Sequence, residues 1–256
     1  GAPPRAGHAA KAPSPCYNKG VRVRQLHPWD VSSEEALALQ RRLASQVCRQ
    51  DRVPPQVRHV AGVDLSPPDA QGAATGAAVV LTYPGLEVVE VRTGRGVPRM
   101  PYVPGLLSFR ESPVLLEALG KLATTPDLLL VDGQGIAHPR RLGIAAHLGL
   151  LVDLPTIGCA KSILRGRHDP LPQEAGAWAP LVDRGEVVGA AVRTRSGVAP
   201  VYVSIGNKVD LPAAIQWTLR CCRGYRLPEP VRLAHQAAAG RLPEQAPASG
   251  RQARLL

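Results

Sequence analysis

The chain has 256 residues, carries a formal net charge of +11, and is 45% hydrophobic. This length suffices for one domain with a sizeable core, and no apolar run approaches the roughly 18 residues that a membrane-spanning helix needs. The five cysteines form no CxxC pair and no zinc-finger spacing, which is typical of reduced thiols in a cytoplasmic protein. The composition therefore argues against a membrane protein and a disulfide-rich secreted protein.

The positive charge favours a polyanionic partner such as nucleic acid, but much of it lies near the ends of the chain. Residues 1–20 are rich in Pro, Ala and Gly and predict a disordered basic tail, and residues 241–256 predict a second flexible tail. Basic tails can add salt-sensitive affinity for phosphates without forming the site. Because no linker divides the rest, residues 21–240 predict a single domain.

Between the tails, helical and extended patterns alternate along the chain. A helix begins at Ser32 or Ser33, followed by two Glu residues, and runs to about Cys48. The next patterns predict an antiparallel meander of three strands, over 57–64, 76–82 and 86–92. Further on they predict helices over 113–123, 142–152, 212–223 and 230–239 and strands over 127–132, 155–160, 187–194 and 200–205. These elements predict an α/β fold with a mixed sheet and helices on both faces.

Two of the predicted strands end in an Asp. These are Asp64 and Asp132, each preceded by apolar residues and followed by a turn. Open α/β sheets place ligands at this edge, and two converging carboxylates need a cation between them. Oxygen ligands without a His/Cys cluster indicate Mg²⁺ or Mn²⁺. The alternative is that each Asp only ends its strand and accepts a bond from a turn amide; spacing alone leaves both open.

Glu111 lies where two helix-start signals overlap. In the first, Ser108 and Glu111 form a capping box, in which the Glu binds its own helix start. In the second, Ser112 is the N-cap and Pro113 the first helical residue, which leaves Glu111 outside the helix and free to act. The local sequence does not decide between them.

A Pro-rich segment over residues 100–105 holds a single aromatic side chain. Pro101 and Pro104 stiffen an extended loop around Tyr102 and Val103, in a chain with only one Phe, three Trp and five Tyr. A wedge that enters a base stack needs this rigidity and apolar bulk. The alternative is a Tyr that folds back onto the core.

Three further features are weak signals alone. Gly133 and Gly135 lie between a strand and a helix, where bare backbone can approach a ligand closely, but His138 stands where a dinucleotide fingerprint needs its third Gly. His235 lies in a short predicted helix, where a His is ordinarily packed or exposed. Lys161 lies in a loop of small residues, and a lone Lys is ordinarily a solvated surface group.

Taken in order, these motifs resemble the endonuclease V family, the deoxyinosine 3′-endonucleases. The joint match is specific, although no single motif would be, and the Pro- and Arg-rich termini lie outside it. The matching runs are VAGVDLS (60–66), PYVPGLLSFRE (101–111), LLVDGQGIAHPRRLGIAAHLG (129–149), DLPTIGCAKS (153–162) and YRLPEPVRLAHQAA (225–238).

The resemblance implies an RNase H-like fold and gives roles to residues of this chain. The family's metal-binding acids fall on Asp64, Glu111 and Asp132, which favours function for Glu111 without excluding a capping role. Its functional Lys and His, which complete the catalytic set, fall on Lys161 and His235. Its wedge falls on Pro101, Tyr102, Val103 and Pro104, and its pocket for a flipped base falls on Leu107, Gly133, Gly135, Gly143 and Ile144.

The implied activity is Mg²⁺-dependent hydrolysis, with Mn²⁺ as a substitute, of the second phosphodiester bond 3′ to inosine or deoxyinosine. It leaves 3′-hydroxyl and 5′-phosphate ends, removes no base, and serves DNA repair. The implied protein is a cytoplasmic monomer that binds deoxyinosine-containing DNA or inosine-containing RNA and no membrane. The alternatives are an inosine-specific ribonuclease, a structure-selective nuclease of the same fold, and a binding protein that has lost catalysis, against which the intact acids argue.

Overall fold

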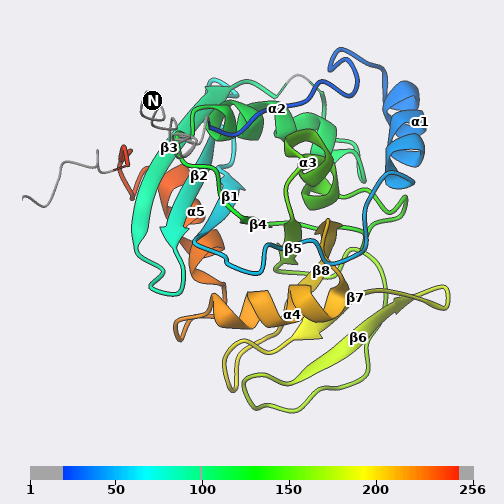
Figure 1. Ribbon diagram of the computed structural model, residues 1–256. Coiled ribbons are helices and arrows are strands. Elements are labelled where there is room, and N and C mark those ends of the chain that lie inside the picture. The colour runs from blue at the N-terminus through cyan, green and yellow to red at the C-terminus, as the bar shows by residue number, and fades with distance from the viewer. Residues whose placement is uncertain (1–19, 99, 248–256) are drawn as a thin grey trace, which may run out of the picture.

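Eight strands form one mixed sheet in the computed structural model of the chain, which describes residues 20–98 and 100–247. Figure 1 shows the strands in the order β3-β2-β1-β4-β5-β8-β7-β6. Their bounds are β1 His59–Leu65, β2 Ala74–Thr82, β3 Val88–Gly96, β4 Leu128–Val131, β5 Thr156–Ala160, β6 Trp178–Asp183, β7 Glu186–Val192 and β8 Val201–Asn207. The helices are α1 Ser33–Ala44, α2 Leu107–Gly120, α3 Ile144–Val152, α4 Leu211–Arg220 and α5 Glu229–Ala238.

The three central strands run parallel, and the outer strands are antiparallel to their neighbours. β1 pairs with β4, and β4 with β5, in parallel, so their carboxyl ends meet at one edge of the sheet. β1, β2 and β3 form the predicted meander, and β8, β7 and β6 extend the opposite side. The parallel centre therefore directs the residues after β1, β4 and β5 to a shared edge.

Helices cover both faces of the sheet, which confirms the predicted fold class (Figure 1). Alternate residues of a strand point to opposite faces, and on β1 Val60 packs into one core while Val63 packs into the other. Helices α4 and α5 bury the first core, and α2 and α3 bury the second. Burying each such side chain contributes about 1.5–3 kcal/mol, so the two cores hold the parallel strands and their shared edge in place.

Helix α1 begins where the sequence predicts and ends earlier. Ser32 is its N-cap, and the Ser32–Glu35 capping box is formed in both directions. The helix ends at Ala44 rather than near Cys48, and Leu43 packs against the outer side of α3.

Helix α2 starts earlier than predicted. It begins at Leu107 instead of Pro113, its N-cap Leu106 makes no side-chain cap bond, and Pro113 lies inside it. Pro113 removes one helical hydrogen bond. The helix continues across it because Phe109 and Leu115 are buried on either side. Tertiary packing therefore decides the start of this helix, rather than the local capping signals.

Strand β6 has no counterpart among the predicted strands. Exposed and buried residues alternate along it, but Pro180 in its middle argues against a strand in a sequence-based reading. β6 is the edge strand next to β7, where Pro is tolerated because one side of the strand makes few ladder bonds.

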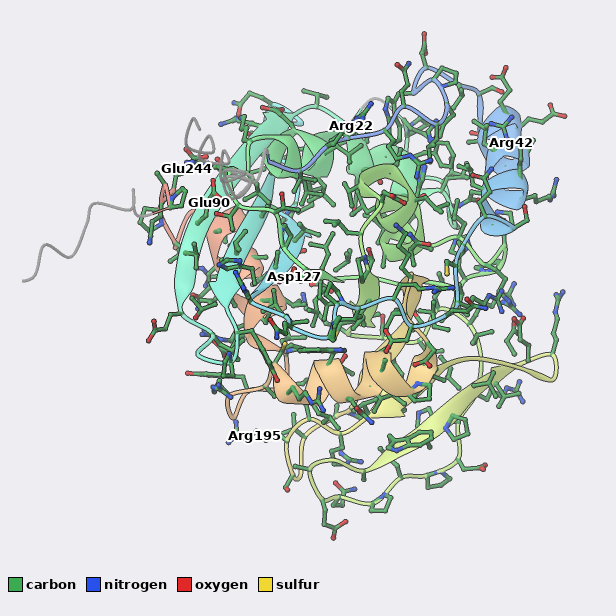
Figure 2. All side chains as sticks on the ribbon, viewed as in Figure 1. Arg22, Arg42, Glu90, Asp127, Arg195 and Glu244 are labelled. Atoms are coloured by element: carbon green, nitrogen blue, oxygen red, sulfur yellow. The ribbon has the colours of Figure 1, made fainter. Side chains whose placement is uncertain are left out.

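The C-terminal segment is held against the sheet further than predicted. Gln245 and Val91 of β3 exchange two backbone hydrogen bonds (2.8 and 3.1 Å). The Glu244 carboxylate accepts bonds from the backbone N–H (2.7 Å) and hydroxyl (2.6 Å) of Thr93, and Figure 2 marks Glu244 near this edge of the sheet. The predicted tail boundary at residue 241 is therefore too early. The predicted N-terminal tail lies, apart from Gly20, outside the described residues.

The described cysteines are free thiols: Cys48, Cys159, Cys221 and Cys222. Burial raises the pKa of the Cys221 and Cys222 thiols to about 12, which keeps both protonated. Cys221 packs in the core beside α4. No helix within residues 20–98 and 100–247 has both the length and the apolar character needed to cross a membrane.

Candidate active site

Asp64 and Asp132 reach the same edge of the sheet from neighbouring parallel strands. Val63 of β1 pairs with Val131 of β4, and the backbone N–H of Asp132 donates to the carbonyl of Val63 (3.2 Å). Each Asp directly follows its Val. The strands are therefore neighbours, as the predicted convergence of the two carboxylates requires.

Each of these carboxylates contacts a basic side chain from another element. Lys161 follows β5, the neighbour of β4, and its Nζ pairs with Asp132 Oδ2. His235 lies on α5, and its Nδ1–H donates to Asp64 Oδ2 (2.7 Å), since a carboxylate only accepts. Asp64 Oδ1 accepts the N–H of Leu65 (2.8 Å). The turn-amide bond that was the alternative role for Asp64 is thus present together with the His235 contact.

Gly62 explains how α5 brings His235 to the end of β1. A Cβ at this position would lie 1.9 Å from the carbonyl oxygen of Pro230, so only Gly lets the start of α5 pack directly on β1. The bond at Nδ1 sets the tautomer of His235 and makes Nε2 the nitrogen that can accept a proton. The side chain is 47% exposed, so substrate or water can reach it.

Glu111 adds a third acid whose ionisation is linked to the other two. Burial, then the charge of Asp64, raises the pKa of Glu111 to about 7; Asp132 adds to this and Arg110 opposes it. Burial and the charge of Asp132 likewise raise the pKa of Asp64. Both local alternatives for Glu111 are wrong, because the helix begins at Leu107 with no capping box and includes Glu111.

The chemistry of this donor set fits Mg²⁺ or Mn²⁺. Asp64, Glu111 and Asp132 offer only oxygen ligands, and a divalent cation would relieve the repulsion that helps to raise the pKa values of Asp64 and Glu111. Their side chains are not gathered into a ready-made centre. Within the described part of the chain, no three His, Cys, Asp or Glu side chains lie close enough together to hold an ion. The ammonium of Lys161 instead supplies positive charge beside Asp132.

The loop around Tyr102 is anchored at both ends. Arg110 donates to the carbonyl of Met100 (2.8 Å) at its start, and the carbonyl of Gly105 accepts several side-chain bonds at its end. Val103 packs against a small core formed by α1 and α2. Tyr102 itself is 71% exposed, so the alternative in which its ring folds back onto the core is wrong.

A small cavity of about 100 Å³ lies beside this loop. Its walls come from the loop, the first turn of α2, the segment after β4, the start of α3 and the loop after β5. The residues that line it are Tyr102, Gly105, Leu107, Ser108, Gln134, His138, Gly143, Ile144 and Leu164.

The predicted pocket residues divide into two groups. Leu107, Gly143 and Ile144 line the cavity. Gly133 and Gly135 are not among its lining residues: a Cβ on Gly133 would lie 2.4 Å from Ile144 Cγ2, and one on Gly135 1.9 Å from the carbonyl oxygen of Ile205. These two glycines let the segment after β4 pack tightly. Of the predicted wedge, Tyr102 lines the cavity, whereas Pro101, Val103 and Pro104 do not.

Comparison with known proteins decides the family, because the endonuclease V family model matches residues 41–236. The chain belongs to the endonuclease V family. A curated relative, endonuclease V of Trichormus variabilis, is 52% identical over 222 residues, which are 86% of this chain and 100% of the relative. The chain is therefore a nuclease.

Solved structures of the family share the fold. Endonuclease V of Streptomyces avermitilis is 42% identical with a TM-score of 0.79, over 87% of this chain and 97% of that one. Endonuclease V of Ciona intestinalis is 28% identical with a TM-score of 0.68, over 81% and 96% of the two chains. That protein was solved with a 24mer DNA containing an inosine followed by a ribo-adenosine. The mixed sheet of this protein is thus the RNase H-like fold that the family resemblance implied.

Arg226, which sequence reasoning missed, holds the backbone of Lys161. Its Nη2 donates to the carbonyls of Lys161 (2.7 Å) and Pro200 (2.8 Å), and its Nε to that of Ala199 (3.0 Å). Its own carbonyl accepts the hydroxyl of Thr194 (2.6 Å). The residues after Lys161 form an exposed loop, so this clamp fixes the point from which the Lys161 side chain extends. Its acceptors are backbone carbonyls, which no sequence pattern marks.

The carbonyl of Gly105 is a second anchor that the sequence did not reveal. It accepts bonds from Gln40 Nε2 (2.8 Å), Arg140 Nη2 (2.8 Å) and His138 Nε2 (3.1 Å). Burial, then the charge of Arg140, lowers the pKa of His138 to about 4, so its ring is neutral at neutral pH. Gln40 is fully buried and also donates to the carbonyl of Leu142 (3.1 Å). These contacts tie the Tyr102 loop to α1 and to the far wall of the cavity.

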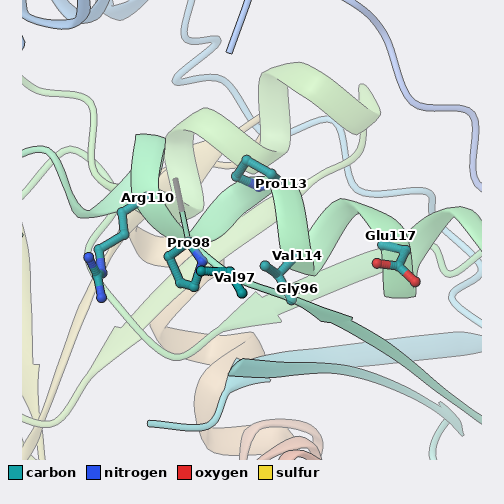
Figure 3. Close-up of a pocket in the computed structure, with 7 residues that line it drawn as sticks. All are labelled: Gly96, Val97, Pro98, Arg110, Pro113, Val114 and Glu117. Atoms are coloured by element: carbon teal, nitrogen blue, oxygen red, sulfur yellow. The ribbon is translucent and has the colours of Figure 1, made fainter. Parts of the chain in front are cut away.

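A larger cavity of about 430 Å³ lies between the end of β3 and α2. Figure 3 shows Arg110 and Glu117 at its two ends, with Val97, Pro98 and Val114 between them. None of the residues that match the family's acids lines it. It is therefore separate from the candidate active site.

Proposed function

We propose that this protein recognises inosine or deoxyinosine in nucleic acid and hydrolyses the second phosphodiester bond 3′ to it, with Mg²⁺ as cofactor. The products would be 3′-hydroxyl and 5′-phosphate ends, the role DNA repair, and the protein a cytoplasmic monomer. The observation that carries the proposal is the pair Asp64 and Asp132 at adjacent strand ends, each in contact with a basic side chain.

The three acids would hold the metal. Asp64 and Asp132 would bind it directly, and Glu111 directly or through water. When bound, Mg²⁺ supplies Lewis acidity towards the scissile phosphate. Support comes from the raised pKa values of Asp64 and Glu111, which are caused first by burial and then by the charges of the neighbouring carboxylates.

The two basic side chains would handle the proton and the charge. Because Asp64 holds the Nδ1–H of His235, Nε2 is the atom that would orient the attacking water or take its proton. Lys161, held beside Asp132, would offset the negative charge that builds on the phosphate. Arg226 would act only through the backbone of Lys161, as a positioning residue.

Selectivity would come from extruding the base into the cavity beside Tyr102. Hypoxanthine pairs less well than adenine, which lowers the energy needed to flip it out of a duplex. The exposed ring of Tyr102, on a loop anchored at both ends, would fill the space that the base leaves. The inosine-containing DNA bound by the Ciona relative supports this substrate.

The second candidate is cleavage of inosine-containing RNA. The strand bound by the Ciona relative carries a ribo-adenosine directly after the inosine, so a 2′-hydroxyl is accommodated in that protein close to the lesion. This observation favours a ribonuclease over a structure-selective nuclease, which would need neither the Tyr102 loop nor a base cavity.

Matched DNA and RNA strands test the proposal. Each would carry one inosine, in single- and double-stranded form, and the cut would be mapped at nucleotide resolution in Mg²⁺ and in chelator. We expect cutting only with the metal, only in inosine strands, and at the second bond 3′ to the base. Cutting that follows strand structure whether or not inosine is present would overturn it.

A further inference from the structure

Tyr225 presents an exposed aromatic ring in the segment between α4 and α5. Its side chain is 52% exposed, although a large hydrophobic ring is ordinarily buried in the core. One face of the ring is covered by the guanidinium of Arg232, whose Cζ lies 4.4 Å from the ring centroid. The other face is therefore open to solvent and free to stack on another flat group.

Arg232 is itself held in place beneath this ring. Its Nε and Nη2 donate to the two carboxylate oxygens of Glu229 (2.9 and 2.6 Å). Glu229 is only 7% exposed, so this forked ion pair is fixed to the start of α5. A cation over an aromatic face attracts it, and a ring that is already ordered loses little freedom when a second group stacks on it. Tyr225 is thus a preformed stacking surface.

This stacking surface borders the candidate active site through two separate connections. Arg226, the next residue after Tyr225, donates to the carbonyl of Lys161 (2.7 Å). Arg232 lies three residues before His235 on α5, and residues three apart are neighbours on one side of a helix. The ring therefore lies beside the basic side chains that contact the carboxylate edge.

Tyr225 and Tyr102 lie on opposite sides of the carboxylate edge. The cavity at Tyr102 is walled in part by α2 and α3, which bury the second core. Tyr225 contacts α5, which buries the first core together with α4. Figure 1 shows these two pairs of helices on opposite faces of the sheet. A strand that runs from the cavity across the carboxylates therefore continues towards Tyr225.

The charges around Tyr225 favour a nucleic acid strand at its open face. Arg226 follows it, and Arg195 is exposed beside Thr194, whose hydroxyl donates to the carbonyl of Arg226 (2.6 Å). The carboxylate of Glu229 is neutralised by its ion pair. Positive charge attracts phosphates, and an aromatic ring stacks on any base, because every base has a π-face.

We infer that the open face of the Tyr225 ring stacks on a base of the substrate strand on the 3′ side of the scissile bond. The direction rests on the proposed function. If the inosine occupies the cavity at Tyr102 and the cut lies 3′ to it, the nucleotides beyond the carboxylates are those that follow the cut. Stacking there tolerates any sequence, so Tyr225 would hold the strand for hydrolysis and leave the choice of substrate to the lesion.

Strands with one abasic nucleotide test the inference, because an abasic nucleotide lacks the base and keeps the phosphate backbone. The cut is first mapped on an intact inosine strand, and abasic nucleotides are then placed one at a time on either side of the mapped bond. The measured quantity is Kd of single strands in chelator. Tyr225→Ala should weaken binding of the intact strand by about tenfold. With the stacked base removed on the 3′ side, Tyr225→Ala and the wild type should bind equally.

Two further variants serve as controls. Tyr225→Phe keeps the ring over Arg232 and should bind every strand as the wild type does. Trp178 is an equally exposed aromatic residue, at 52%, on the edge strand β6. Trp178→Ala should therefore leave Kd unchanged.

The outcomes separate this inference from the proposed function. If the wild-type protein does not cut inosine strands in preference to others, the proposed function fails, and the direction of the strand fails with it. If it does cut them and Tyr225→Ala binds as tightly as the wild type, only this inference fails. A loss that is the same on every abasic strand would also overturn it, because Tyr225 would then support the fold or the backbone contacts. A loss that is abolished only by an abasic nucleotide on the 5′ side would contradict the assigned direction.

Discussion

The carboxylate edge and the base cavity differ in how far the protein completes them by itself. At the edge, Asp64 and Asp132 already have His235 and Lys161 as partners. At the cavity, the ring of Tyr102 is exposed and has no such partner in the contacts described above. Two of the carboxylates proposed for hydrolysis thus have basic partners in advance, whereas the ring of Tyr102 proposed for recognition stands exposed until a substrate binds. Changes in the two regions should therefore affect different steps.

The largest expected effect comes from Asp132→Asn. The change preserves size but removes the charge that would hold Mg²⁺ and that pairs with Lys161, so single-turnover cleavage should fall by at least about a hundredfold. Binding to an inosine strand should largely survive, because the cavity is untouched. The matched control, Asp30→Asn at an exposed position, should cleave normally. Substantial Mg²⁺-dependent cutting by folded Asp132→Asn protein would falsify the role of this carboxylate.

The next effect tests the recognition region. Stacking of a base on an aromatic ring is worth about 1–3 kcal/mol, so Tyr102→Ala should weaken binding to an inosine duplex by about ten- to a hundredfold. Loss on a single strand should be smaller, since less stacking is broken there. Tyr102→Phe keeps the ring and should retain most of the affinity. Equal losses on inosine and undamaged duplex would remove the wedge role and leave Tyr102 as a general contact.

A smaller effect concerns the clamp on Lys161. Arg226→Ala should lower the single-turnover rate at saturating enzyme by about tenfold with little change in Kd, since Arg226 holds only the backbone of Lys161. Arg226→Lys keeps the charge but loses the forked donors, so it should not restore the rate. Arg223→Lys, at an exposed position in the same segment, is the control.

A double-mutant comparison sharpens the result. In a Lys161→Ala background, the further change Arg226→Ala should have little effect on the rate, because the residue that it positions is gone. Additive losses, or full rescue by Arg226→Lys, would show that Arg226 contributes charge to the substrate and not position to Lys161.

The smallest effect concerns the stability of the fold that supports both regions. It depends on a buried pair of His residues. The Nε2 atoms of His27 and His147 lie 2.8 Å apart, between the segment before α1 and α3. Burial lowers the pKa of His147 to about 3 and also lowers that of His27. In the unfolded chain each His binds a proton near pH 6.5, so the unfolded state binds more protons below that pH. The contribution of this His pair to the free energy of unfolding is therefore fully present above about pH 6.5 and is lost as the pH falls towards 3.

Urea unfolding between pH 7 and pH 5 measures this linkage. His147→Leu removes one of the linked protons, so the free energy of unfolding should fall with acidification less steeply than in the wild type, by up to about 1.4 kcal/mol per pH unit. His168→Leu is the control, because His168 lies partly exposed in the loop after β5. The same slope in His147→Leu and the wild type would mean that His147 is not held neutral by folding.

The parts of the fold that the sequence predicts are those with strong local signals. The apolar runs that end in Asp64 and Asp132 mark buried strands with carboxylates at one edge, and the strands are indeed adjacent. Edge strand β6 was missed because Pro180 breaks its pattern, and the start of α2 was misplaced because packing overrides the capping signals. Local sequence therefore shows the parallel centre of the sheet better than its margins.

The contacts that support the site are harder to predict for a different physical reason. Arg226 acts on the carbonyl of Lys161 and Gln134 on that of Ser162. Every residue has a backbone carbonyl. The identity of the acceptor residue therefore leaves no trace in the sequence. Such contacts are visible only once the chain is folded.

One crossed measurement tests most directly whether recognition and hydrolysis are divided between the two regions. Kd in chelator and the single-turnover rate at saturating enzyme in Mg²⁺ would be measured on one inosine strand for the wild type, Asp132→Asn and Tyr102→Ala. We expect Asp132→Asn to bind and not cut, and Tyr102→Ala to bind weakly yet cut at close to the wild-type rate once saturated. If each change lowers affinity and rate by the same factor, the division between the carboxylate edge and the base cavity is wrong.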